Sequence, residues 1–483
     1  MLGFFYTFEQ MNIEELYHLF QQYPNICTDS REIKKDSIFF ALKGESFDGN
    51  EYAAEAIDKG CAFAVIAELK SLDEKFILVD DVLHTLQKLA KHHRDQLEIP
   101  VIGITGSNGK TTSKELISAV LSTEKRCYAT KGNLNNHIGV PLSILEINHD
   151  HEIAIIEMGA NHIGEIAALC EIAQPNLGII TNIGKAHLEG FGNLDGVIQA
   201  KTELYKYIKL NVKGKIFVNE DDDLLVDLAY KFGFRDRFLN ALELNLYDSE
   251  SREDYIKRKV NAIDNAKINS NFISTNLLNL VIAKAKGENS DSFINVSPQR
   301  WDTIVPPRYT PEGWGETIYS NLIGDYQFYN IALAITIGQY FHISYENSKK
   351  AIENYTPTNN RSEIIKTKNN TLILDAYNAN PSSMKAMLTS FSKQVYKNKL
   401  CILGDMLELG EASKKEHKAI LELTKKLSLE TIFVGEEFSK VCSEAYEKTS
   451  ALAEKISNTS IKNKTILLKG SRGIALEKLV DLL

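Results

Sequence analysis

The sequence predicts an α/β protein of three domains with a doubly wound parallel sheet at its centre. The strongest signal is an apolar, β-branched segment at 100–104, followed by a glycine-bounded turn and a helix-spaced segment that ends at Leu121. Short apolar strands alternate with helical patterns along much of the chain, which is typical of parallel sheets. At 483 residues the chain is too long for one core. We expect domains at 1–98, 99–356 and 357–483.

Composition and charge exclude several classes of protein. Hydrophobic residues make up 43% of the chain and charged residues 25%, as in soluble globular proteins. The net charge of −9 gives no global basic footprint for nucleic acid. Six scattered cysteines without a CxxC pair favour reduced thiols. Because there is neither a signal-peptide pattern nor a membrane span of roughly 18 apolar residues, we expect a cytoplasmic protein that enters no membrane. We also expect a monomer, although no sequence pattern fixes the oligomeric state.

The first 98 residues predict a small α/β domain. Strand patterns occur at 37–42 and 62–67, and helical periodicity occurs at 51–59 and 82–97. Two polar clusters interrupt these elements, one at 28–31 and one at 43–50. Taken alone, both clusters fit turns, because Asp, Ser and Gly favour turn conformations.

The turn at 105–111, Thr-Gly-Ser-Asn-Gly-Lys-Thr, has the layout of a phosphate-binding loop. Backbone N–H groups converge on an anion at such a turn, and the dipole of the following helix adds positive potential. Lys110 would reach the β- and γ-phosphates, and the Thr111 hydroxyl would hold Mg²⁺. Gly106 and Gly109 enclose two residues instead of the common four, which fits ATP-dependent ligases better than GTPases or kinases. An ordinary strand-to-helix turn is the alternative.

Two further strands are expected to end beside this loop. The segment 151–156 delivers Glu157 at its carboxyl end, and the segment 177–183 is followed by His187. Ligands bind beyond the carboxyl ends of strands in open parallel sheets. We therefore expect Glu157 and His187 near the loop, with a hydrogen-bonded loop histidine as the alternative for His187.

A lysine lies on the apolar side of the helix expected at 194–208. Lys201 is three or four residues from Val197 and Leu204, and so shares their stripe. A buried ammonium is costly unless it is paired, neutralised or modified. Lys201 could reach solvent or pair with a carboxylate. Alternatively, its neutral amine captures CO₂ and becomes a carbamate that binds metal.

The remainder of the chain divides at about residue 357. Residues 230–320 are charge-rich and polar, and we assign them to the periphery of the central domain. Two helices are expected at 330–341 and 345–355. For the third domain we expect a Rossmann-like arrangement with strands at 371–374, 400–403, 431–434 and 465–468. It has no GxGxxG motif, so we assign no dinucleotide to it.

Several motifs in fixed order resemble the Mur ligases. The resemblance covers most of the chain except roughly 235–315, and it includes TDSRE and ALKGESFDGN near the N-terminus. The other matching motifs are TGSNGKTTSKE at 105–115, GNLNNHIGVPL at 132–142, EMGANHIGEI at 157–166, NIGKAHLEGFG at 182–192, AKTEL at 200–204, DAYNANPSSM at 375–384, LGDMLELG at 403–410 and KGSRG at 469–473.

The resemblance implies an ATP-dependent ligase of peptidoglycan synthesis that joins D-alanyl-D-alanine to UDP-N-acetylmuramoyl-tripeptide. ATP would phosphorylate the terminal carboxylate of the tripeptide, and the amine of D-alanyl-D-alanine would attack the acyl phosphate. The resemblance also implies two Mg²⁺ sites, one on Thr111 and Glu157 and the other on His187 and a carbamylated Lys201.

Roles for individual residues follow from the same resemblance. Lys110, Glu157, Asn182, His187 and Lys201 would form the catalytic centre. The ATP-binding residues would be Thr105, Gly106, Ser107, Asn108, Gly109, Lys110, Thr111, Thr112, Asn330, Arg361, Asp375, Tyr377 and Asn378. The substrate-binding residues would be Ser30, Arg31, Lys43 and Gly44 for the UDP moiety, and Asn133, Asn135, Asn136, Asn161 and His162 for the peptide.

The chain departs from the family pattern before Arg361, where the family often has glycine. Asn360 stands there and can adopt the left-handed conformation. Two other functions compete with the ligase: folylpolyglutamate synthase, which lacks a dedicated N-terminal uridine-nucleotide domain, and a nucleotide-binding scaffold without chemistry. Lys110, Thr111, Glu157, His187 and Lys201 together argue against the scaffold.

Overall fold

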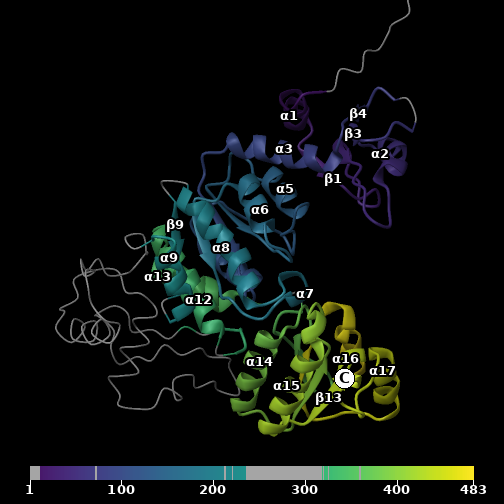
Figure 1. Ribbon diagram of the computed structural model, residues 1–483, viewed down its shortest axis with the longest axis vertical. Coiled ribbons are helices and arrows are strands. Elements are labelled where there is room, and N and C mark those ends of the chain that lie inside the picture. Colours follow the sequence, from purple (N-terminus) through teal and green to yellow (C-terminus); the bar gives the residue numbers. More distant parts are fainter. Residues whose placement is uncertain are drawn as a thin grey trace, which may run out of the picture.

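The computed structural model describes residues 11–70, 73–210, 214–219, 221–234, 318, 320–324, 326–357 and 360–483. Within these residues the strands form three sheets, each accompanied by helices (Figure 1). The predicted α/β class with three bodies is confirmed. The ranges 1–98, 99–356 and 357–483 remain our proposal for the domain limits. Most of the stretch 230–320, which we assigned to the central periphery, lies outside the described residues.

The N-terminal sheet is fully parallel, with strand order β1-β2-β3-β4. The strands predicted at 37–42 and 62–67 are found and are slightly shorter than expected. The elements are α1 (Ile13–Gln22), β1 (Asn25–Cys27), β2 (Ser37–Phe40), η1 (Gly49–Tyr52), α2 (Ala53–Asp58), β3 (Phe63–Ile66), β4 (Phe76–Leu78) and α3 (Val82–Asp95).

The central sheet is also fully parallel, with strand order β6-β7-β5-β8-β9. The phosphate-loop strand β5 is the middle strand, because the chain turns to one side for β6 and β7 and to the other for β8 and β9. Its elements are β5 (Val101–Thr105), α4 (Lys110–Leu121), β6 (Cys127–Ala129), α5 (Gly139–Leu145), β7 (Ile153–Glu157), α6 (Glu165–Ala173), β8 (Leu177–Ile180), α7 (Leu188–Phe191), α8 (Leu194–Leu210), β9 (Lys215–Phe217), α9 (Asp223–Lys231), α12 (Gln327–Tyr340) and α13 (Tyr345–Asn354).

Helices cover both faces of the central sheet, as a doubly wound arrangement requires. On one face Ile102 and Ile104 of β5 pack against α4, α12 and α13. On the other face Val101 packs with α5, α6 and α8. This alternation along β5 is the period-two pattern of a strand buried on both sides. The sheet therefore holds the loop after β5 between two packed layers.

The C-terminal sheet has strand order β10-β11-β14-β12-β13 and is mixed. We predicted four strands there, and the structure adds a fifth, β10, antiparallel to β11 at one edge. The elements are β10 (Glu363–Lys366), β11 (Thr371–Asp375), α14 (Pro381–Lys393), β12 (Lys399–Gly404), η2 (Gly410–Ala412), α15 (Ser413–Lys426), β13 (Thr431–Val434), α16 (Glu436–Ser439), α17 (Thr449–Asn458), β14 (Thr465–Lys469), η3 (Arg472–Ile474) and η4 (Leu476–Leu482).

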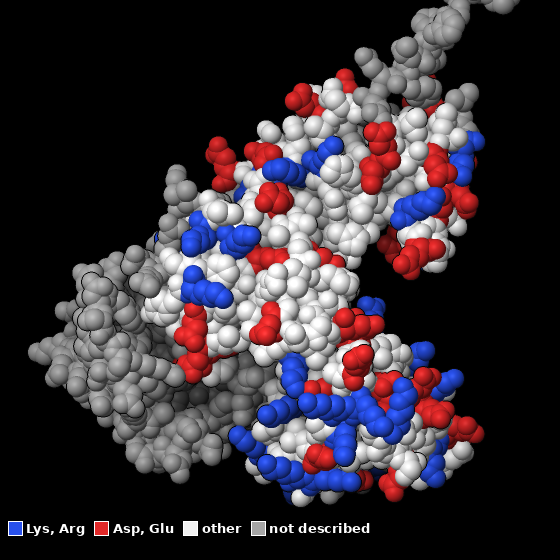
Figure 2. Space-filling view, viewed as in Figure 1, with Lys and Arg blue, Asp and Glu red and all other residues white. Residues whose placement is uncertain are grey.

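Surface charge is uneven between the bodies. Figure 2 shows Lys and Arg gathered over the C-terminal body, where α15 exposes five lysines: Lys414, Lys415, Lys418, Lys425 and Lys426. Acidic side chains are interspersed over all three bodies in the same view. Among the helices that the structure describes, none combines the length and the apolar character that crossing a membrane requires.

Helix α3 joins the N-terminal and central bodies through a buried guanidinium. Arg94 is 6% exposed, and its Nε donates to the Ala173 carbonyl at the end of α6 at 3.0 Å. Its other nitrogens donate to the carbonyls of Leu97 and, at 3.4 Å, of Ile99 and Gln174. These acceptors include the unpaired carbonyls of a helix end, so the cation stabilises both α6 and the connection into β5.

Replacing Arg94 tests this connection. Arg94→Met should lower the free energy of unfolding by about 3 kcal/mol, because several buried carbonyls lose a charged donor. The control Lys88→Met, on the exposed side of α3, should change it by less than about 0.5 kcal/mol. Urea unfolding followed by circular dichroism measures both. Equal midpoints for the two variants would show that Arg94 does not support the junction.

Candidate active site

A cavity of about 1240 Å³ opens at the carboxyl edge of the central sheet and is closed on one side by the C-terminal body. The central body contributes the phosphate loop, the ends of β7 and β8, and the side chain of Asn330. The predicted site residues that line the cavity are Ser107, Asn108, Gly109, Lys110, Thr111, Thr112, Asn135, Asn136, Glu157, Asn161, Asn182, His187, Asn330, Arg361, Asp375, Tyr377 and Asn378.

The phosphate loop has a glycine conformation at both of its bounds. Gly106 has φ +144°, and a Cβ there would lie 2.0 Å from Thr181 Oγ1. Gly109 has φ +79° and begins α4. A larger residue at position 106 would clash with Thr181, just after β8, so the close approach of the two strand ends requires glycine there.

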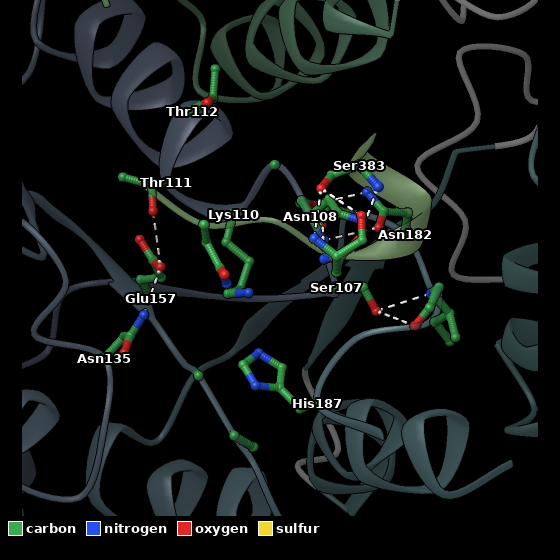
Figure 3. A pocket seen from close by; sticks show the side chains of 18 of the residues that line it. Ser107, Asn108, Lys110, Thr111, Thr112, Asn135, Glu157, Asn182, His187 and Ser383 are labelled. Carbon is green, nitrogen blue, oxygen red and sulfur yellow. Dashed lines mark hydrogen bonds between the residues drawn. The ribbon is translucent and has the colours of Figure 1, made fainter. Parts of the chain in front are cut away.

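Asn182, at the end of β8, clamps the loop. Its Oδ1 accepts from the Asn108 N–H at 3.0 Å, and its Nδ2 donates to the Asn108 carbonyl at 2.9 Å. Ser107 adds a backbone bond to the Asn182 carbonyl at 3.0 Å. Asn182 therefore acts on the backbone of the loop in this structure, and Figure 3 shows it beside Asn108.

Glu157 is the last residue of β7 and is 1% exposed. Its Oε1 accepts from the Thr111 hydroxyl at 3.1 Å and from Asn135 Nδ2 at 2.8 Å (Figure 3). Its Oε2 is buried without a hydrogen bond, 3.6 Å from Lys114 Nζ. A carboxylate oxygen without a donor, next to a threonine hydroxyl, fits the oxygen ligands that Mg²⁺ prefers.

Two lysine side chains lie nearby, one of them partly buried and the other fully buried. Lys110 Nζ donates to the Gly106 carbonyl at 2.7 Å, and burial lowers the pKa of this ammonium. Lys201 is 1% exposed on the apolar stripe of α8, as predicted, with Nζ 5.3 Å from the centre of the Phe191 ring. Burial, together with the charge of Lys110, lowers the pKa of Lys201 to about 7. Burial therefore favours the neutral form of this amine.

His187 begins α7 with a left-handed backbone, φ +51°. Its ring lines the cavity, and in Figure 3 it lies below Lys110 and apart from the Thr111–Glu157–Asn135 group. Nδ1 lies 2.5 Å from Oε2 of Glu408 in the C-terminal body. The histidine is therefore in contact with both bodies.

The C-terminal wall of the cavity is basic and aromatic. The Arg361 guanidinium stacks on Tyr377, 3.8 Å from the ring centre, and Lys469 Nζ pairs with Asp375 at 2.7 Å. Asn360 has φ +58°, which confirms that asparagine takes the left-handed conformation before Arg361. The two bodies meet directly at the loop, where Asn380 Nδ2 donates to Asn108 Oδ1 at 2.7 Å.

Other predicted site residues do not line the cavity. Thr105 ends β5, Gly106 is the next residue of the turn, and Lys201 is buried on α8. Asn133 and His162 are exposed outside it. The four predicted UDP contacts, Ser30, Arg31, Lys43 and Gly44, belong to the N-terminal body and do not line it either.

The predicted UDP residues make local contacts with their neighbours. Arg31 pairs with Asp29 at 2.5 Å, and Lys43 pairs with Asp48 and Glu68 at 3.1 and 3.0 Å. A Cβ on Gly44 would lie 2.5 Å from the ring of Phe47. Both cations are largely exposed, at 84% and 61% of their side chains, so an anionic ligand can reach them.

Two buried lysines of the site, Lys114 and Lys469, were missed in the sequence. Lys114 on α4 is 2% exposed and donates to the Gly132 carbonyl at 3.1 Å, besides facing Glu157. The signal that singled out Lys201 is present here too, since Lys114 lies three residues before the core residue Ile117.

The sheets and the cavity define a P-loop nucleotide-binding enzyme whose site lies between two α/β bodies. Three family models match the chain: "Mur ligase family, catalytic domain" at residues 22–94, "Mur ligase middle domain" at 104–338, and "Mur ligase, glutamate ligase domain" at 360–472. The chain belongs to the Mur ligase family, whose members are ATP-dependent peptide ligases. The resemblance stated from the motifs is confirmed.

Relatives match over nearly the full length. The UDP-N-acetylmuramoyl-tripeptide--D-alanyl-D-alanine ligase of Bacillus subtilis is 31% identical, over 94% of this chain and 92% of the relative. The Escherichia coli enzyme of the same name is 28% identical over 94% and 92%. A solved MurF structure from Acinetobacter baumannii, 28% identical, matches with a TM-score of 0.74 over 95% and 93% of the two chains. Folylpolyglutamate synthase of Mycobacterium tuberculosis, 13% identical with a TM-score of 0.50, shares the fold alone.

The clamp on the phosphate loop can be tested by nucleotide affinity. Asn182→Ala should raise the Kd for ADP about thirtyfold, because two hydrogen bonds that fix Asn108 are lost, at a cost of about 2 kcal/mol. Isothermal titration calorimetry measures this, with Asn458→Ala on α17 as a control outside the cavity. An unchanged Kd in Asn182→Ala would mean that the loop keeps its shape without the clamp.

Proposed function

We propose that the chain joins D-alanyl-D-alanine to UDP-N-acetylmuramoyl-tripeptide and converts ATP to ADP and phosphate. A carboxylate oxygen of the tripeptide attacks the γ-phosphorus, and ADP leaves. The amine of D-alanyl-D-alanine then attacks the carbonyl carbon of the acyl phosphate. The amine loses a proton, and the tetrahedral intermediate collapses to the amide with phosphate as the leaving group. The product is the UDP-linked pentapeptide.

The observation that carries this proposal is the composition of one cavity. It joins a phosphate loop, an asparagine-rich wall with Asn135, Asn136 and Asn161, and a C-terminal wall with Arg361. Phosphoryl transfer needs positioned cations, and amide formation needs two reactants clamped side by side. Neutral amides suit the carboxylates and amides of the two peptide substrates. The cavity therefore supplies cations for phosphoryl transfer and amides that can clamp two peptide substrates. The proposed reaction needs no nucleophilic side chain.

Thr111 and Glu157 are our proposed ligands for a Mg²⁺ ion on the nucleotide. The fit rests on the Glu157 oxygen that has no hydrogen bond and on the adjoining hydroxyl. Such an ion would neutralise phosphate charge. Lys110 would then leave the Gly106 carbonyl for the phosphates, where its charge is compensated.

Lys201 is proposed to carry a carbamate that binds a second Mg²⁺ together with His187. Its amine is buried, and it has one weak contact, with the Ala160 carbonyl at 3.5 Å. Reaction with CO₂ forms an N–C bond and releases the proton from nitrogen, which replaces a costly buried cation by an anionic oxygen ligand. We propose that Arg361 and Asn330 bind the nucleotide. Arg31 and Lys43 are our proposed contacts to the diphosphate of the UDP moiety.

Location and assembly complete the proposal. We expect a monomer in the cytoplasm, where nucleotide-linked substrates and ATP are available. The cavity is closed by residues of one chain, and the described cysteines are free thiols: Cys27, Cys61, Cys127, Cys170, Cys401 and Cys442.

Phosphate release from ATP tests the reaction. Release should require both UDP-N-acetylmuramoyl-tripeptide and D-alanyl-D-alanine, with less than about 1% of the full rate when either is omitted. L-alanyl-L-alanine serves as the matched control for the acceptor amine, and mass spectrometry identifies the pentapeptide. Hydrolysis at the full rate without either substrate would contradict the ligase assignment.

The carbamate is tested by removing the amine. Lys201→Ala should lower kcat at least about 10³-fold, and added acetate should restore part of the loss by supplying carboxylate oxygens. Lys206→Ala, on the exposed side of the same helix, should keep the normal rate. Steady-state kinetics with acetate titration decide the matter. A near-normal rate in Lys201→Ala would exclude the carbamate.

A further inference from the structure

The loop between β12 and η2 carries one carboxylate of the C-terminal body to the central site. Glu408 contacts the start of α7 twice: its carbonyl accepts from the Glu189 N–H at 3.1 Å, and its Oε2 lies 2.5 Å from His187 Nδ1. Gly410 follows against Glu189, where a Cβ would lie 3.4 Å from the Glu189 Cα. The loop is thus docked directly on the turn that bears the histidine.

Core contacts fix the loop immediately before Glu408. The buried Asp405 carboxylate accepts from the N–H groups of Glu437 and Phe438, both at 2.8 Å. The Met406 N–H donates to His417 Nε2 at 3.0 Å, and the Leu407 N–H donates to Ser471 Oγ at 3.0 Å. Since three consecutive residues are anchored in the C-terminal body, the position of Glu408 depends on how that body is docked.

Both partners of the contact have an unfavourable backbone conformation. Glu408 has φ +62° and His187 has φ +51°, and neither is glycine. Such conformations are unfavourable for residues with a Cβ and persist where the surrounding structure enforces them. Because Glu408 and His187 both adopt such a conformation at one contact between the two bodies, we infer that this contact has a functional role.

We propose that Glu408 is a positioning residue for His187, supplied by the C-terminal body. The inference rests on the proposed function, in which His187 binds a divalent cation. Among the described residues Nδ1 has no aligned hydrogen-bond partner, so Glu408 acts by charge at close range. A carboxylate at Nδ1 favours the tautomer that carries its proton there and leaves a lone pair on Nε2 for the cation. Docking of the C-terminal body thereby prepares the metal ligand.

A neighbouring contact provides a matched control. Lys185 Nζ pairs with Glu416 at 2.6 Å, and the Lys185 N–H donates to Ser382 Oγ at 3.1 Å. This pair joins the same two bodies, two residues before His187, without touching the imidazole. Loss of the Glu416 carboxylate therefore weakens docking alone, whereas loss of the Glu408 carboxylate weakens docking and also removes the charge beside Nδ1.

The test compares Glu408→Gln with Glu416→Gln. Glu408→Gln should lower kcat about 10- to 100-fold, as losses of carboxylates behind histidine ligands do, and leave the KM for ATP within twofold. Without turnover, electron paramagnetic resonance with an unhydrolysable ATP analogue should show Mn²⁺ bound about tenfold more weakly. Glu416→Gln should stay within twofold of the original chain in both measurements.

A double-mutant cycle separates positioning from a structural role. In a His187→Ala background, Glu408→Gln should have no further effect on kcat or Mn²⁺ affinity, because it acts through the missing ring. Glu408→Asp, which keeps the charge, should recover part of kcat and carries the test if the glutamine variant misfolds. Additive losses, equal losses in Glu416→Gln, or full activity in both Glu408 variants would overturn the inference. A wild-type chain without substrate-dependent phosphate release would instead overturn the proposed function.

Discussion

Charge held out of water at one edge of the central sheet is the constraint on which the site depends. Glu157 and Lys201 are each 1% exposed, and the partly buried Lys110 lines the cavity nearby. Removing such groups from water costs several kcal/mol each unless partners compensate. The compensation within the protein is partial. One Glu157 oxygen has no hydrogen bond and faces Lys114 at 3.6 Å, and Lys201 contacts the Ala160 carbonyl at 3.5 Å and the Phe191 ring. In the function that we propose, phosphate, a divalent cation and CO₂ would supply the missing partners.

The fold determines where this charge can be kept. With β5 in the middle of the sheet, the loop after it is flanked by the ends of β7 and β8, which bring Glu157 and Asn182. Layers on both faces exclude water from the strand ends. The open side is covered by the C-terminal body through contacts such as Asn108 with Asn380. Binding of nucleotide and docking of this body are therefore linked at the same loop.

Local sequence patterns were sufficient for the elements that carry the site. Glycine spacing and a β-branched strand located the phosphate loop, and helical periodicity placed Lys201 among core residues, where it lies in α8. Local sequence patterns did not predict the features that depend on contacts between segments far apart in the chain. The four-residue edge strand β10 is too short to show a period, and its pairing with β11 decides its structure. The Glu408–His187 contact joins residues more than 200 positions apart, and no local pattern encodes how two bodies dock.

The most direct measurement is a crystal structure of the protein grown with ADP, Mg²⁺ and bicarbonate. We expect one cation on Thr111 and Glu157, a carbamate on Lys201 Nζ, and a second cation between that carbamate and His187. Lys110 should have moved from the Gly106 carbonyl to the phosphates. An unmodified Lys201 amine paired with a carboxylate, with no cation at Glu157, would contradict the claim that the buried charges of this edge are completed by the substrates and metal.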